Sequence, residues 1–107
     1  MSGHLSERRR HQRIKVDKSI LKTPGLTALD MSESGMGLSC VRAQPLGKEL
    51  VLELDLNGQP LSIKAVVRWC STAKSIYEGG YHLGVEFEGH SISNQLLIRE
   101  YIANAKK

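Results

Sequence analysis

The sequence predicts an all-β domain that is closed by one C-terminal helix, in the form of a six-stranded antiparallel β-barrel. Six short stretches alternate apolar and polar residues, and Asn57-Gly58 between two of them is a strong hairpin signal. The last stretch changes to a helical period. With 107 residues the chain allows one domain with a modest core. Closing the sheet into a barrel would remove its exposed edges, and the helix could cover an open end.

The first half of the chain contains three of the predicted strands. Residues 1–12 have almost no apolar side chains, so we expect a flexible basic arm there and assign the barrel and helix to residues 13–107. Alternation predicts a strand over residues 14–17, and Pro24-Gly25 marks the turn that follows. Residues 26–31 and 36–40 are the second and third predicted strands, joined by a tight polar connection.

The second half contains the clearest period-two pattern, over residues 50–56. After Asn57-Gly58, apolar residues recur at every second position over residues 61–69, which predicts a fifth strand with one buried face. A looser stretch follows, and residues 81–87 are the sixth predicted strand. Apolar residues between positions 97 and 102 recur at the spacing of one helix face. Either Ser91 or Ser93 could cap this helix, and Lys106-Lys107 would suit the negative end of its dipole.

Composition excludes several classes of protein. The hydrophobic and charged fractions, 40% and 24%, are those of a soluble globular domain. No apolar run approaches the roughly 20 residues that cross a bilayer, and no secretory leader opens the chain, so we expect a cytoplasmic protein without membrane insertion or a separate effector domain. Cys40 and Cys70 have no metal-ligand spacing and are expected to be reduced thiols. The scattered histidines and the absence of a nucleophile motif argue against an enzyme.

The positive charge is concentrated near the N-terminus. Six cationic side chains, among them Arg8, Arg9 and Arg13, stand against Asp17 alone over residues 8–18, so the rest of the chain is close to neutral. Guanidinium groups match phosphate oxygens and the O6/N7 edge of guanine. The cluster therefore indicates an anionic partner, although a solvated charged tail would have the same composition.

A second cluster is the spacing Asp30-x-Ser32-x-x-Gly35. One interpretation is a turn, because Asp and Ser bond to nearby backbone N–H groups and Gly permits positive φ. The other is a ligand pocket in which the carboxylate accepts the N1–H and N2–H donors of a guanine.

Taken in order, the two clusters resemble the signature of the PilZ domain, which is Arg-x-x-x-Arg in an N-terminal segment followed by Asp/Asn-x-Ser-x-x-Gly on a barrel. Residues 66–69 and 83–87 also look like later strands of that family, so the similarity spans about residues 7–103. The resemblance implies a PilZ-type barrel that binds the second messenger cyclic di-GMP, with no cofactor or metal. Arg9 and Arg13 would clamp phosphates and guanine edges, Asp30 would pair with a guanine, Ser32 would bond near a phosphate and Gly35 would shape the turn.

Two further residues carry weaker implications from the resemblance. An arginine at the position of Arg8 accompanies binding of two intercalated dinucleotides in the family. Trp69 has the parity of the buried residues before it, which favours packing in the core or at the barrel end over stacking on a guanine, and it stays among the ligand candidates. Arg68 should point outward.

The leading hypothesis is a cyclic di-GMP receptor and adaptor whose arginine arm orders on binding and presents a surface to an unidentified effector protein. The family implies control of motility, exopolysaccharide or biofilm. One alternative is a PilZ-like protein-interaction module without nucleotide binding. Another is a general nucleic-acid-binding barrel. It is disfavoured because such proteins stack bases on surface aromatic side chains, and the aromatic residues here mostly stand at strand positions that are expected to be buried.

Overall fold

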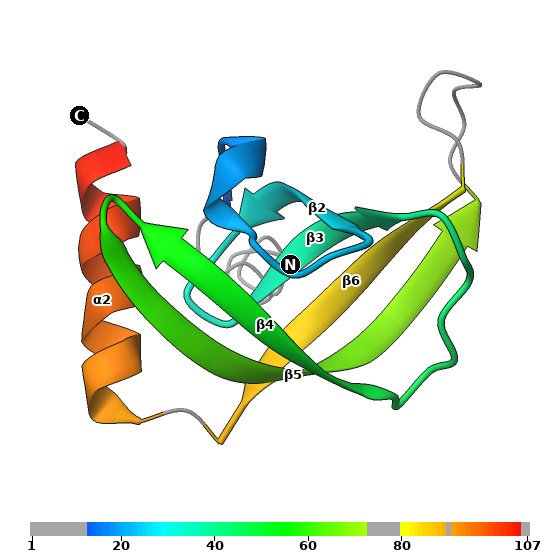
Figure 1. The fold of residues 1–107 in the computed structure, drawn as a ribbon. Coiled ribbons are helices and arrows are strands. Elements are labelled where there is room, and N and C mark those ends of the chain that lie inside the picture. The colour runs from blue at the N-terminus through cyan, green and yellow to red at the C-terminus, as the bar shows by residue number, and fades with distance from the viewer. Residues whose placement is uncertain (1–12, 73–79, 90, 106–107) are drawn as a thin grey trace, which may run out of the picture.

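The computed structural model describes residues 13–72, 80–89 and 91–105. The predicted arm, with Arg8 and Arg9, and the Lys106-Lys107 pair lie outside the described residues. Six antiparallel strands form a curled half-barrel with one C-terminal helix, which confirms the predicted fold class (Figure 1). The elements are β1 (Ile14–Lys15), the 3-10 helix η1 (Lys18–Ile20), β2 (Leu26–Met31), β3 (Gly35–Cys40), β4 (Glu49–Leu56), β5 (Gln59–Thr72), β6 (Tyr81–Glu88) and α2 (Ile92–Ala105).

The strands lie in the order β1-β2-β3-β6-β5-β4, and every neighbouring pair is antiparallel. The curl brings the segment after η1 to the free edge of β4. Leu21 forms a bridge with Leu54, and the Lys22 N–H donates to the Glu53 carbonyl at 2.8 Å. These contacts cover part of the β4 edge, which would otherwise expose unpaired backbone groups.

The core fills the concave side of the curled sheet. Met31, Met36 and Leu38 have no exposed surface, because the inward positions of β2 and β3 meet those of β4, β5 and β6. Helix α2 lies across one end of the half-barrel and adds Ile98 and Ile102 to this core (Figure 1). Cys40 is buried and Cys70 is half-buried, and both are free thiols, as predicted.

Local chemistry explains the boundaries of several elements. Asn57 and Gly58 have φ values of 56° and 89°, the left-handed pair that a type I′ hairpin requires. Ser91 is the helix cap, because its Oγ accepts the Asn94 N–H at 3.1 Å. The first strand is shorter than predicted: the Asp17 carboxylate accepts the Ser19 N–H at 2.8 Å and starts η1 instead, and this hydrogen bond lowers the pKa of Asp17.

Two β-bulges interrupt the alternation, one in β2 between Ala28 and Asp30 and one in β5 between Val67 and Trp69. Each bulge inserts a residue, so the side chains beyond it change face. The indole of Trp69 is consequently half exposed, at 50%, and the expectation that it packs in the core is wrong. No helix in the described part of the chain is both long and apolar enough to span a bilayer.

Candidate functional site

The carboxylate of Asp30 is the centre of the candidate site. Its Oδ1 accepts three hydrogen bonds, from Arg13 Nε at 3.1 Å, from Arg13 Nη2 at 2.6 Å and from the Gly37 N–H at 2.9 Å. No described residue donates a hydrogen bond to Oδ2. The carboxylate is thus fixed through one oxygen and keeps the other as an acceptor for a donor from outside.

Strand pairing brings Arg13 to Asp30. Arg13 directly precedes β1, and β1 pairs with β2 so that Lys15 lies opposite Asp30. The two side chains remain 49% and 38% exposed, so the ion pair lies on the surface and can be reached by a ligand. The structure therefore brings together two of the residues that the sequence proposed, while Arg8 and Arg9 lie outside the described residues.

Ser32 lies in the connection between β2 and β3, at 1% exposure. Its Oγ accepts the Ser34 N–H at 3.2 Å and lies 3.3 Å from the Ser34 hydroxyl, while its own N–H donates to the Gly35 carbonyl at 2.9 Å. These bonds are those of a tight turn, which is one of the two interpretations of the motif. In this arrangement Ser32 shapes the connection next to Asp30.

Gly35 is required for a reason other than the predicted one. It is the first residue of β3 and is not among the glycines with positive φ. A Cβ at this position would collide with the carbonyl group of Val85 on the neighbouring strand β6. The glycine therefore permits a close approach of two backbones.

One transverse row of the sheet connects Asp30 to Trp69. Asp30 is paired with Gly37, Gly37 with Gly84 and Gly84 with Trp69, across β2, β3, β6 and β5. A Cβ on Gly37 would lie 2.7 Å from Asp30 Oδ1, and a Cβ on Gly84 would lie 2.6 Å from Trp69 Cδ1, with Nε1 still closer. The Asp30 carboxylate therefore lies over Gly37 from the β2 side, and the Trp69 indole lies over Gly84 from the β5 side. We call these four residues the glycine-floored platform.

Gly37 and Gly84 were not predicted as site residues from the sequence. Both stand inside strands, where glycine is unfavourable and often marks a place that another group approaches closely. That signal was available. It did not show which side chains would occupy the space, because the partners come from strands distant in sequence.

Two ion pairs border the site. Arg68 points outward, as predicted, and its guanidinium binds Glu86 Oε1 at 2.7 Å. Glu33, inside the β2–β3 connection, accepts a hydrogen bond from Arg99 Nε of α2 at 2.9 Å. The second pair links the helix directly to the segment that carries the motif.

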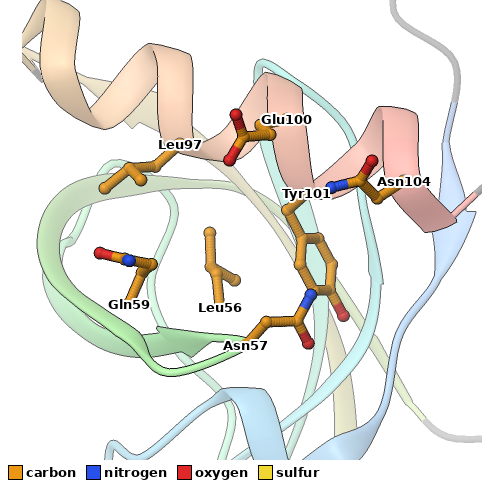
Figure 2. A pocket seen from close by; sticks show the side chains of 7 residues that line it. All are labelled: Leu56, Asn57, Gln59, Leu97, Glu100, Tyr101 and Asn104. Carbon is orange, nitrogen blue, oxygen red and sulfur yellow. The ribbon is translucent and has the colours of Figure 1, made fainter.

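A separate hollow of about 170 Å³ lies between α2 and the β4–β5 turn. Figure 2 shows the ring of Tyr101 extending from the helix toward Asn57 at this turn. Among the described residues that line it, Glu100 is the one charged side chain, beside the side-chain amides of Asn57, Gln59 and Asn104. The described lining carries a carboxylate, which disfavours an anionic ligand, so its chemistry does not match that of the basic N-terminal cluster.

Comparison with known proteins identifies the family of the chain. A family model for the PilZ domain matches residues 7–104, and the chain therefore belongs to the PilZ domain family. Among solved structures, the fold is similar to that of the inhibitor of motility (MotI/DgrA) of Bacillus subtilis, with a TM-score of 0.69 and 16% identity. The match covers 92% of this chain and 51% of that protein, so this chain corresponds to about half of its length. No curated protein sequence matches.

Proposed function

We propose that this protein is a receptor for cyclic di-GMP and acts by binding, without a catalytic step. The observation that carries the proposal is the state of Asp30. Its Oδ1 is held by Arg13 and the Gly37 N–H, while Oδ2 has no donor among the described residues and would accept one such as the N1–H or N2–H of a guanine. Membership of the PilZ family supports a cyclic dinucleotide as the source of that guanine.

The ligand's two phosphates would be neutralised by arginines. The guanidinium of Arg13 uses Nε and Nη2 toward Asp30, which leaves Nη1 for a phosphate oxygen. In this proposal Arg8 and Arg9 add further charge from the N-terminal arm. Fixing each arm residue costs about 1–2 kcal/mol of conformational entropy, and charge-assisted hydrogen bonds of about 1.5–3 kcal/mol each must offset that cost.

The output of such a receptor would be the ordered arm, which presents a new surface to an effector protein. The similar Bacillus protein is named an inhibitor of motility, and on that analogy we propose motility as the first process to examine, with exopolysaccharide synthesis and biofilm control next. A receptor for an intracellular messenger would work in the cytoplasm.

Calorimetric titration with cyclic di-GMP, with GTP and cyclic GMP as comparison ligands, tests the proposal. We expect selective binding of the cyclic dinucleotide and a severe loss in Arg13→Ala. The stoichiometry would show whether one or two nucleotides bind, and two would support the role of Arg8. A folded wild-type protein that shows no binding at high micromolar ligand would refute the receptor.

A second candidate is a PilZ-like protein-interaction module that binds no nucleotide. The closed Arg13–Asp30 ion pair favours it, because each charge already has a partner without any ligand. In-cell function that survives Arg9→Ala/Arg13→Ala would support this candidate. A general nucleic-acid-binding role would instead appear as oligonucleotide affinity that falls steeply with salt and is insensitive to Asp30→Ala.

A further inference from the structure

The two glycines of the platform determine where its two functional side chains can lie. Gly37 and Gly84 are directly paired, on strands about 5 Å apart. The Asp30 carboxylate covers Gly37 from the β2 side, and the Trp69 indole covers Gly84 from the β5 side. An acceptor and an aromatic ring therefore lie next to each other on the outer face of the sheet, with main chain beneath them.

We propose that Gly37 and Gly84 are specificity-determining positioning residues for a planar base with N–H donors on one edge. This inference rests on the proposed nucleotide binding and deepens it. The exposed face of the indole would stack on the base, and the open Oδ2 of Asp30 would accept its N–H donors.

The arrangement discriminates between purines. Guanine presents two neighbouring N–H donors, at N1 and N2, and both suit a carboxylate. Adenine presents an amino donor beside N1, which is an acceptor and would be repelled by the Asp30 carboxylate. Cyclic di-GMP and cyclic di-AMP have the same phosphates and sugars, so the difference between their affinities reports on the base alone.

Each glycine controls one half of the platform. An alanine at position 84 would place its Cβ against three atoms of the indole ring, so Trp69 would have to leave the sheet. An alanine at position 37 would place its Cβ 2.7 Å from Asp30 Oδ1 and disturb the 2.9 Å bond from the Gly37 N–H. The first change removes the stacking surface, and the second displaces the acceptor.

The test compares Gly84→Ala, Trp69→Ala and the double variant, with Ser39→Ala on the same face of β3 as the control. Trp69 is the single tryptophan in the chain, so its fluorescence reports the indole without any ligand. We expect a shifted emission maximum and stronger acrylamide quenching in Gly84→Ala. Calorimetry should show about a 5- to 150-fold loss of cyclic di-GMP affinity, the range that corresponds to loss of one stacked base.

The double variant provides the decisive comparison. Because the methyl group added at position 84 clashes with the indole, Trp69→Ala/Gly84→Ala should bind like Trp69→Ala alone. Gly37→Ala, which acts on the acceptor, should bring the affinities for cyclic di-GMP and cyclic di-AMP closer together, and it keeps the inference testable if Gly84→Ala fails to fold. Where the wild type binds, one contrary result is that the affinity losses of the two single variants add up in the double variant, and another is that Trp69 fluorescence is unchanged in Gly84→Ala. Either result overturns this inference and leaves the proposed function standing. Absence of wild-type binding overturns the proposed function, and with it the base specificity.

Discussion

Removal of the Asp30 carboxylate should weaken ligand binding strongly and lower the stability of the fold only slightly. In the proposed complex the open Oδ2 accepts at least one donor from a guanine. A hydrogen bond to a charged acceptor contributes about 1.5–3 kcal/mol, so Asp30→Ala should weaken cyclic di-GMP binding by about 10- to 150-fold for each bond lost. Isothermal titration calorimetry at fixed ionic strength measures this directly.

The effect of Asp30→Ala on folding should be small. The Arg13–Asp30 pair is 49% and 38% exposed, and exposed ion pairs contribute about 0.2–1 kcal/mol. The freed Gly37 N–H lies beneath a carboxylate that water can reach, so water could replace the lost acceptor. For a domain of this size, a change of 1 kcal/mol lowers the unfolding midpoint by about 4–8 °C, and we expect no more than that.

Glu86→Ala is the matched control, since it removes a carboxylate from another exposed pair, Arg68–Glu86, at 54% and 53% exposure. It should leave cyclic di-GMP affinity undiminished while it costs similar stability. If Asp30→Ala binds as tightly as the wild type, or if Glu86→Ala loses as much affinity, the assignment of Asp30 as the guanine acceptor is wrong.

Three further predictions concern the fold. Leu38 is fully buried, so Leu38→Ala should lower the free energy of unfolding by about 2–5 kcal/mol in urea denaturation, whereas a loss below about 1 kcal/mol would contradict the core position. Ser91→Ala should cost about 1 kcal/mol because it removes the acceptor of the Asn94 N–H, and Ser93→Ala, within the first turn of the helix, serves as its comparison. Burial, aided by the charge of Asp17, raises the pKa of Tyr101 above its usual value of about 10. A raised folded-state pKa stabilises the fold below the unfolded pKa, and this contribution is lost as pH rises through the folded value. Tyr101→Phe should therefore reduce the loss of thermal stability as pH rises above about 10, and an unchanged alkaline profile would refute this.

Local patterns in the sequence were sufficient for most of the fold. The strand over residues 26–31 has the predicted bounds, and the hairpin at Asn57-Gly58 forms because both residues accept positive φ. These features depend on neighbouring residues, which period and turn chemistry describe well. The short helix η1 was missed because it depends on one capping bond at Asp17, inside a segment that alternates like a strand.

The candidate site was predicted in part, since a motif identifies residue types and not their positions in space. The family resemblance gave Arg13 and Asp30 separate contacts with a ligand, and the structure adds a direct ion pair between them, because β1 pairs with β2 in a register that brings them together. Gly35 was named from the motif as the residue that shapes the turn, whereas the structure requires a glycine there because the Val85 carbonyl approaches it and not because of a positive φ. That reason involves a strand about 50 residues away, which local patterns do not reveal.

The largest error of the sequence prediction is the placement of Trp69, and the β-bulges that caused this error also create the glycine-floored platform. With strict alternation, Asp30 would face inward like Ala28, and Trp69 would face inward like Val67. The bulges at Leu29 and Arg68 reverse both parities and place the carboxylate and the indole on the outer face, in one row. Deleting either bulge residue would turn one of these side chains toward the core, so the two irregularities that defeat period-two prediction are the features that bring the site together.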